Sequence, residues 1–174
     1  FAFLDTPWRG SSEATPHILL YTDAPGYGAG QISHALVRDW VEAGYRVTCV
    51  QPPLKDHLLE ERLALGVALR FLPPENLYDL SRPARSLSDP SEACKLLREE
   101  RPDLVIFADG CAFSNLAAKE VALELGFKIG VIAHAAFEGW LEDYAPYHDQ
   151  LVSLGQRYPL VTVSEENLHW YRSR

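Results

Sequence analysis

The chain of 174 residues is 47% hydrophobic and 23% charged. This length and composition fit one globular domain and exclude a chain that is disordered throughout. The formal net charge of −8 disfavours nonspecific binding to nucleic acid or to anionic membranes.

The sequence contains no apolar run as long as the roughly 18 residues that a membrane-spanning helix needs. We therefore expect no transmembrane segment, and we also expect no secretory leader. The sequence has no methionine, so we expect it to be a piece of a longer protein. Its cysteines, Cys49, Cys94 and Cys111, are odd in number and widely spaced. Free thiols are typical of a reducing compartment, so we expect a cytoplasmic protein without a disulfide framework.

Residues 1–15 show no periodicity, and we expect an irregular N-terminal arm there, followed by one domain over 16–174. Apolar runs and three- to four-residue spacings predict alternating strands and helices in that domain. In chain order these are a strand at 17–22, a helix at 31–43, a strand at 46–50, a helix at 55–65, a strand at 67–72, a long loop at 73–87, a helix from the Asp89 cap to 100, a strand at 104–108, a helix from the Ser114 cap to 126, a strand at 128–133, a helix at 146–154, a strand at 160–163 and a helix that opens at Ser164.

The predicted strands are continuously apolar rather than alternating, which is typical of strands that are covered on both faces. Strands that alternate with helices favour parallel pairing with right-handed crossovers. We therefore predict an α/β fold with a doubly wound, Rossmann-like parallel sheet in the order 3-2-1-4-5-6.

The segment between the first strand and the first helix is rich in glycine, with Gly26, Gly28 and Gly30 shortly after Asp23. Backbone N–H groups and the helix dipole at such a junction can receive an anion. The pattern is not G-x-G-x-x-G, and Gln51 rather than an acid closes the second strand, so NAD or FAD binding is disfavoured. Two interpretations stay open: a turn that needs small residues, or the close approach of a phosphate or sugar.

The carboxyl ends of other predicted strands carry further polar residues, and ligands of doubly wound sheets gather at these ends. Asp109, His134 and Ser164 are the candidates there. His134 is either a structural histidine or a ligand contact, and Ser164 is either a helix cap or part of the site. His134 and Glu138 lack a third ligand, so we expect no metal. No G-x-S-x-G surrounds Ser114, so a serine hydrolase is excluded.

Taken together, these pieces resemble the N-terminal domain of GT-B retaining glycosyltransferases of the sucrose-synthase/mannosyltransferase kind, the group 1 and group 4 set. That family opens with a strand, Asp or Ser, a glycine-rich loop, a long helix and a strand of the form Gly-(Tyr/His)-x-Val-x-(Val/Leu). Here the last piece reads GYRVTCV at 44–50, and PDLVIF at 102–107 and VTVSE at 161–165 agree as well. The family loop commonly has two adjacent glycines followed by Ala or Thr and an acid, and 28–31 reads GAGQ instead.

The resemblance implies an enzyme that transfers a sugar from a nucleotide-sugar donor to an unknown sugar, lipid or small-molecule acceptor, without a cofactor. Its donor is held mainly by a C-terminal domain that this sequence lacks, so the isolated chain is expected to be inactive. His134 matches a histidine that contacts the donor sugar near the reacting carbon and is the candidate catalytic residue. The candidate substrate- or phosphate-binding residues are Asp23, Gly26, Gly28, Gly30, Gln31, Asp109 and Ser164. A stand-alone binding domain without chemistry is the alternative, and a Rossmann enzyme that binds a cofactor is a third.

Overall fold

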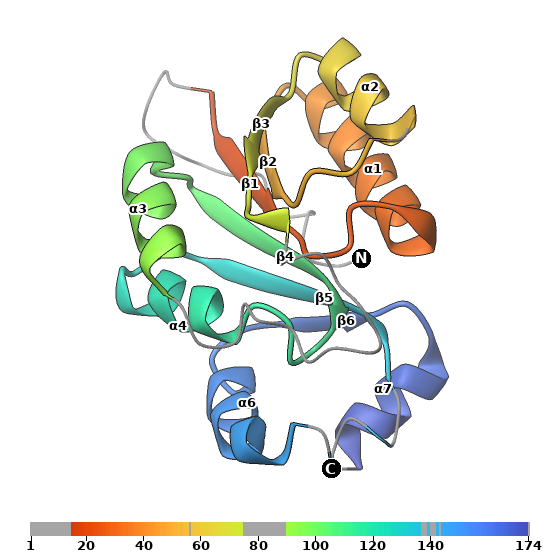
Figure 1. The fold of residues 1–174 in the computed structure, drawn as a ribbon, viewed down its shortest axis with the longest axis vertical. Helices are drawn as coiled ribbons and strands as arrows, with labels where there is room; N and C mark the ends of the chain where they lie inside the picture. The colour runs from red at the N-terminus through yellow and green to blue at the C-terminus, as the bar shows by residue number, and fades with distance from the viewer. Residues whose placement is uncertain are drawn as a thin grey trace.

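The computed structural model describes residues 15–55, 57–74, 90–136, 139, 142 and 144–173. The strands in this part form one six-stranded parallel sheet in the order β3-β2-β1-β4-β5-β6, which confirms the predicted fold (Figure 1). They are β1 (His17–Tyr21), β2 (Arg46–Gln51), β3 (Ala68–Phe71), β4 (Leu104–Cys111), β5 (Ile129–Ala135) and β6 (Leu160–Thr162). Nearly all of the predicted arm and of the predicted 73–87 loop, together with Asp89 and Glu138, lies outside the described residues.

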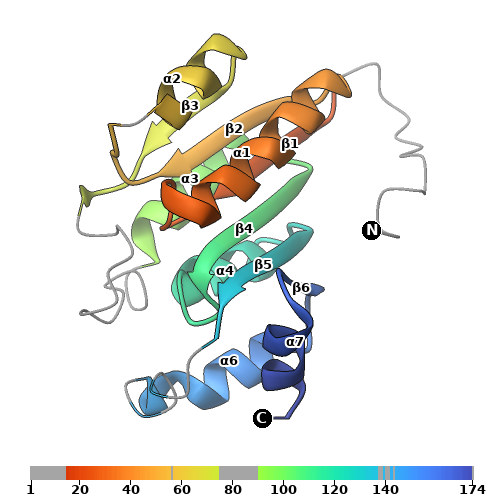
Figure 2. The ribbon, with the colours of Figure 1, turned by 90° about the vertical axis from the view of Figure 1, so that its right-hand side faces the viewer.

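The helices cover both faces of the sheet (Figures 1 and 2). They are α1 (Tyr27–Glu42), α2 (His57–Ala64), α3 (Ser91–Glu100), α4 (Leu116–Glu124), the short 3-10 helix η3 (Ala145–Tyr147), α6 (His148–Gly155) and α7 (Glu165–Arg172). Successive residues of β1 face opposite layers, because Ile18 and Leu20 pack with Val37 of α1, whereas Leu19 packs with Leu97 of α3. The continuously apolar strand is therefore explained by two separate cores. No described helix is both long enough and apolar enough to cross a membrane.

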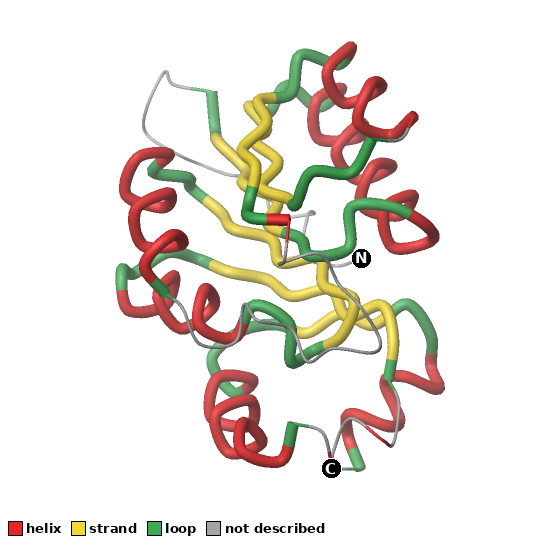
Figure 3. Tube along the Cα trace, in the orientation of Figure 1, coloured by secondary structure: helices red, strands yellow, loops and turns green. Residues whose placement is uncertain are grey.

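The starts of α1 and α4 differ from the sequence prediction in their capping residues. Helix α1 begins at Tyr27 with Gly26 as its N-cap, so Gly28 and Gly30 lie in its first turns rather than in a loop. The predicted Ser114 cap is wrong: the residue before α4 is Asn115, whose φ of 55° is left-handed. Asn tolerates that conformation better than most residues. The connection between β1 and α1, drawn as a loop in Figure 3, is consequently shorter than predicted.

A buried polar network closes the opposite, amino edge of the sheet. The His17 side chain is buried, with Nδ1 at 2.7 Å from Arg46 Nη2 and Nε2 at 2.9 Å from Thr48 Oγ1. Because Arg46 can only donate, Nδ1 is an acceptor and the imidazole is neutral. Burial lowers the pKa of His17, and the positive charge of Arg46 lowers it further. This network therefore has a structural role at the amino ends of β1 and β2.

Candidate functional site

The sheet brings most of the sequence-predicted site residues to one edge. Asp23 follows β1 by two residues, Asp109 and His134 lie near the carboxyl ends of β4 and β5, and Ser164 follows β6 by two residues. Because all strands are parallel, these positions share the carboxyl edge of the sheet, where Gly26 also starts α1. The sequence could predict that these residues share one edge, because each of them lies at the end of an apolar run or shortly after it.

Asp23 is fully buried and links the end of β1 to β4. Its Oδ1 accepts a hydrogen bond of 3.0 Å from the backbone N–H of Gly110. Its Oδ2 is buried without a hydrogen-bond partner among the residues that the structure describes. Burial raises the pKa of Asp23, although the Gly110 N–H, the Ser114 hydroxyl and the charge of Lys119 favour the ionised form. The carboxyl group is therefore a support of the turn after β1 rather than a group open to solvent.

Asp109 forms a buried ion pair with Lys119 of α4. The carboxylate Oδ2 lies 2.6 Å from Lys119 Nζ, and both side chains are 0% exposed. Asn115 Nδ2 donates to Asp109 Oδ1 at 2.6 Å, and Lys119 Nζ also donates to the backbone oxygens of Ala112 (2.9 Å) and Ser114 (2.7 Å). Burial raises the pKa of Asp109 against the effect of the lysine, and the Asp109 charge raises the pKa of Lys119 despite its burial. These contacts fix the turn between β4 and α4.

Sequence reasoning missed Lys119, although a signal was present. Helix α4 reads LAAKEVALE, and Lys119 follows the buried Leu116 by three residues and precedes the buried Ala122 by three. Residues at this spacing share one face of a helix. A lysine on an apolar stripe indicates a buried partner, because an unpaired ammonium is costly to bury.

The start of α1 presents backbone rather than side chains. Gly26 is extended and no side chain caps the helix, while Gly28 and Gln31 are exposed. A Cβ on Gly28 would meet nothing within 4 Å, whereas one on Gly30 would lie 2.1 Å from the backbone oxygen of Pro25. Gly30 is thus required by close packing, and the first N–H groups of α1 are left for water or a ligand. Contact of this turn with a substrate stays a prediction.

His134 lies in β5 rather than just after its strand, and its side chain is half-buried. Its Nε2 is buried and makes no hydrogen bond within the described part of the chain. Burial lowers the pKa of His134, so the imidazole is neutral at pH 7 and can accept or donate one hydrogen bond. Within the described ranges, no group of three or more His, Cys, Asp or Glu residues could hold a metal ion.

Ser164 is the N-cap of α7, as predicted, and is exposed. Its Oγ accepts a hydrogen bond of 3.1 Å from the backbone N–H of Asn167. This cap accounts for the serine structurally, and a contact with substrate stays a prediction. Two α7 side chains that the sequence did not single out, Asn167 and Tyr171, bind backbone groups of β5.

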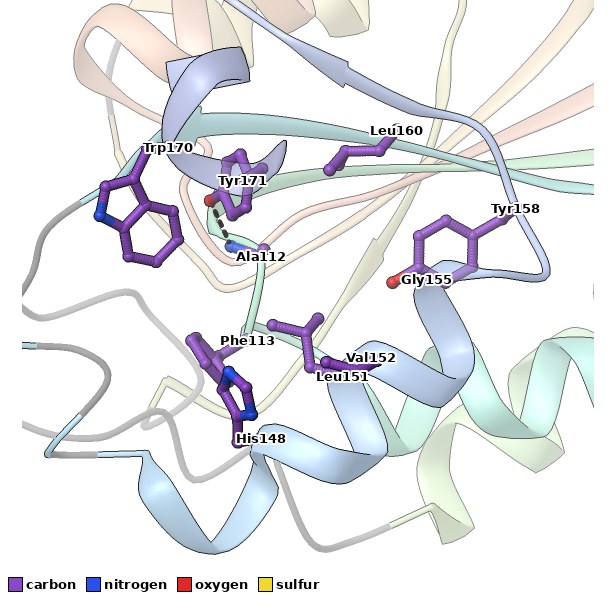
Figure 4. Close-up of a pocket in the computed structure, with 10 residues that line it drawn as sticks. All are labelled: Ala112, Phe113, His148, Leu151, Val152, Gly155, Tyr158, Leu160, Trp170 and Tyr171. Carbon is purple, nitrogen blue, oxygen red and sulfur yellow. Dashed lines mark hydrogen bonds between the residues drawn. The ribbon is translucent and has the colours of Figure 1, made fainter. Parts of the chain in front are cut away.

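A pocket of about 250 Å³ lies between α6, α7 and the turn after β4 (Figure 4). Aromatic and aliphatic side chains form most of its lining: Ala112, Phe113, His148, Leu151, Val152, Gly155, Tyr158, Leu160, Trp170 and Tyr171. None of the sequence-predicted site residues is among them. Tyr171 connects the pocket to β5, because its hydroxyl binds the backbone oxygen of Ala135.

Comparison with known families shows which family this domain belongs to. The model of Glycosyltransferase Family 4 matches residues 27–165, which is well over half of the chain. The chain belongs to this glycosyltransferase family. The match confirms the resemblance to a GT-B N-terminal domain, and the retaining subtype stays a prediction. A search of curated proteins finds no match to this glycosyltransferase-family chain.

Several solved structures are similar to this family 4 domain at low sequence identity. One is the glycotransferase of kitacinnamycin, with a TM-score of 0.49, 20% identity and coverage of 83% of this chain and 39% of that one. A UDP-glucosyltransferase from Polygonum tinctorium has a TM-score of 0.50 and 16% identity, covering 82% and 34%. A UDP-N-acetylglucosamine 2-epimerase has a TM-score of 0.49 and 12% identity, covering 80% and 37%. The chain thus spans about two fifths or less of the length of these three proteins.

Proposed function

We propose that the chain is the acceptor-side, N-terminal domain of a glycosyltransferase that moves a sugar from a nucleotide-sugar donor to an acceptor. The family match over 27–165 carries the proposal. In this proposal residues 1–15 are an arm, 16–174 form the domain, and a donor-binding domain follows in the longer protein. Sequence beyond Arg174 tests it directly: roughly two hundred residues with a second doubly wound pattern support it. A stop codon close to Arg174 favours a stand-alone binding domain instead.

In the proposed reaction His134 is the catalytic residue, because a neutral imidazole at a strand end can hydrogen-bond a sugar hydroxyl. The N–H groups at the start of α1, around Gly26 and Gly28, are proposed to face the negative charge that develops on the leaving diphosphate. Gln31 and Ser164 are exposed and can touch a substrate directly. The buried Asp23, Gly30 and Asp109 act by holding the edge in shape.

His134→Ala tests the catalytic assignment in the protein that includes the donor domain. We expect turnover to fall about a hundredfold, the scale of one positioned polar group, with an almost unchanged melting temperature. The half-buried side chain makes no hydrogen bond through Nε2 in the described part of the chain, so its loss has little structural cost. Wild-type turnover in His134→Ala would make the histidine structural.

The isolated chain is expected to bind nucleotide-sugars weakly, because most donor contacts belong to the second domain in this proposal. Calorimetry with UDP-glucose and GDP-mannose should give dissociation constants no tighter than about 1 mM, or about −4 kcal/mol. Micromolar binding of either sugar by residues 1–174 would contradict the division of labour between two domains.

A further inference from the structure

Helix α7 holds the carboxyl end of β5 through two side chains. Asn167 Nδ2 donates to the backbone oxygen of His134 at 3.2 Å, and the Tyr171 hydroxyl donates to the backbone oxygen of Ala135 at 2.8 Å. Asn167 and Tyr171 are four residues apart, so they share one face of the helix. The two carbonyl groups belong to consecutive residues, so α7 binds a single short piece of backbone.

Tyr171 also joins this piece of β5 to the neighbouring strand. Its hydroxyl accepts a hydrogen bond of 3.3 Å from the backbone N–H of Ala112, drawn as the dashed line in Figure 4. The β4–β5 pairing ends at Cys111 and Ala135. The Tyr171 hydroxyl therefore bridges the ends of β4 and β5 at the point where their pairing stops. Burial raises the pKa of Tyr171, so the hydroxyl keeps the proton that it donates.

On its other side, β5 continues beyond the last residue that pairs with β6. The pairing of β5 with β6 ends at Ala133 and Thr162, one residue before His134. The Asn167 amide supplies a hydrogen bond to His134 at the point where β6 no longer pairs. Asn167 is itself held, because its own N–H is capped by Ser164. The strand end that carries His134 is thus fixed by α7 rather than by the sheet on this side.

We propose that Asn167 and Tyr171 are positioning residues for His134, which hold the backbone from which its imidazole projects. The proposal rests on the role proposed above for His134 in sugar transfer. The ring nitrogen Nε2 makes no hydrogen bond to the described part of the chain, so the ring's place depends on the backbone beneath it. A displacement of about 1 Å at a reacting group can cost about a hundredfold in rate.

An NMR titration of the 174-residue chain tests the contact without any need for catalysis. The His134 ring signal is assigned by its loss in His134→Gln and followed in Asn167→Ala, Tyr171→Phe and the double variant. We expect the His134 pKa to move up toward its ordinary value of about 6.5 as the loosened strand end gains water. Glu166→Gln, at an exposed site of α7, is the matched control and should leave the titration unchanged. An unchanged His134 titration in a folded double variant overturns the proposal.

Steady-state kinetics of the protein with its donor domain separates this inference from the proposed function. Tyr171→Phe and Asn167→Ala should each lower kcat about tenfold or more and leave the donor KM within about twofold. If both keep wild-type kcat while His134→Ala loses turnover, the positioning role is wrong and the proposed function stands. If His134→Ala itself keeps turnover, sugar transfer stands but the histidine is structural, and the positioning role falls with its catalytic role, whatever the titration shows.

Discussion

The Lys119–Asp109 ion pair offers the sharpest test of how the carboxyl edge is built. Lys119→Met removes the ammonium, keeps most of the buried side-chain volume, and leaves the Asp109 carboxylate and two backbone oxygens without their donor. Breaking a buried pair by removing one partner costs about 3–5 kcal/mol of the free energy of unfolding. For a chain of this length each kcal/mol lowers the melting temperature by about 2–4 °C, so we expect a loss of about 6–20 °C at pH 8.

The same variant should recover part of this stability at acidic pH. Burial raises the pKa of Asp109 in the folded protein, and loss of Lys119 removes the main opposing charge. A carboxyl group whose pKa is raised on folding supports stability below its unfolded value of about 3.9, and this contribution is lost as the pH rises through the folded value. The penalty measured by urea unfolding should therefore shrink from pH 8 to pH 5.

Two comparisons make this result interpretable. Lys95→Met, at an exposed site of α3, should change the free energy of unfolding by less than about 0.5 kcal/mol. Lys119→Met combined with Asp109→Asn should regain part of the loss, because no uncompensated charge is then buried. If Lys119→Met alone unfolds within about 1 kcal/mol of the wild type at pH 8, the pair does not hold the turn and the reasoning is wrong.

Other stability predictions follow from the glycines and the amino edge. Gly30→Ala places a Cβ 2.1 Å from the Pro25 oxygen and should lower the free energy of unfolding in urea by at least about 1–3 kcal/mol. Gly28→Ala has open space around its Cβ and should be neutral or stabilise α1 by up to about 1 kcal/mol. Equal effects of the two substitutions would refute the packing argument. Because burial and Arg46 lower the pKa of His17 in the folded state, its contribution to stability is present above the unfolded value of about 6.5 and falls as the pH drops below it. His17→Gln should flatten the dependence of the free energy of unfolding on pH between 7 and 5, and an unchanged slope would show that another group is responsible.

The sheet was predictable because each strand carries its own signal, a short apolar run bounded by a helix period. The start of α1 was not, because glycines lower helix propensity and their pattern resembles a loop. A Cβ on Gly30 would meet the nearby Pro25 backbone and also Leu58 of α2, and the contact with Leu58 is a tertiary one that the local pattern does not reveal. The same limit applies to Tyr171, whose partners are 36 and 59 residues away along the chain.

The candidate site contains two groups of residues, those that are fully buried and those that keep access to solvent. Asp23 and Asp109 are 0% exposed, so they can meet a substrate only if the turns around them open. His134 and Gly28 keep access to solvent at the same edge. Sugar transfer needs water kept from the reacting carbon, because water competes with the acceptor. One open edge of a sheet supplies a single wall, so in the proposed reaction the second wall must come from another part of the protein. A histidine whose backbone is held by α7 and whose Nε2 makes no hydrogen bond to the described part of the chain is suited to meet a substrate enclosed between those walls.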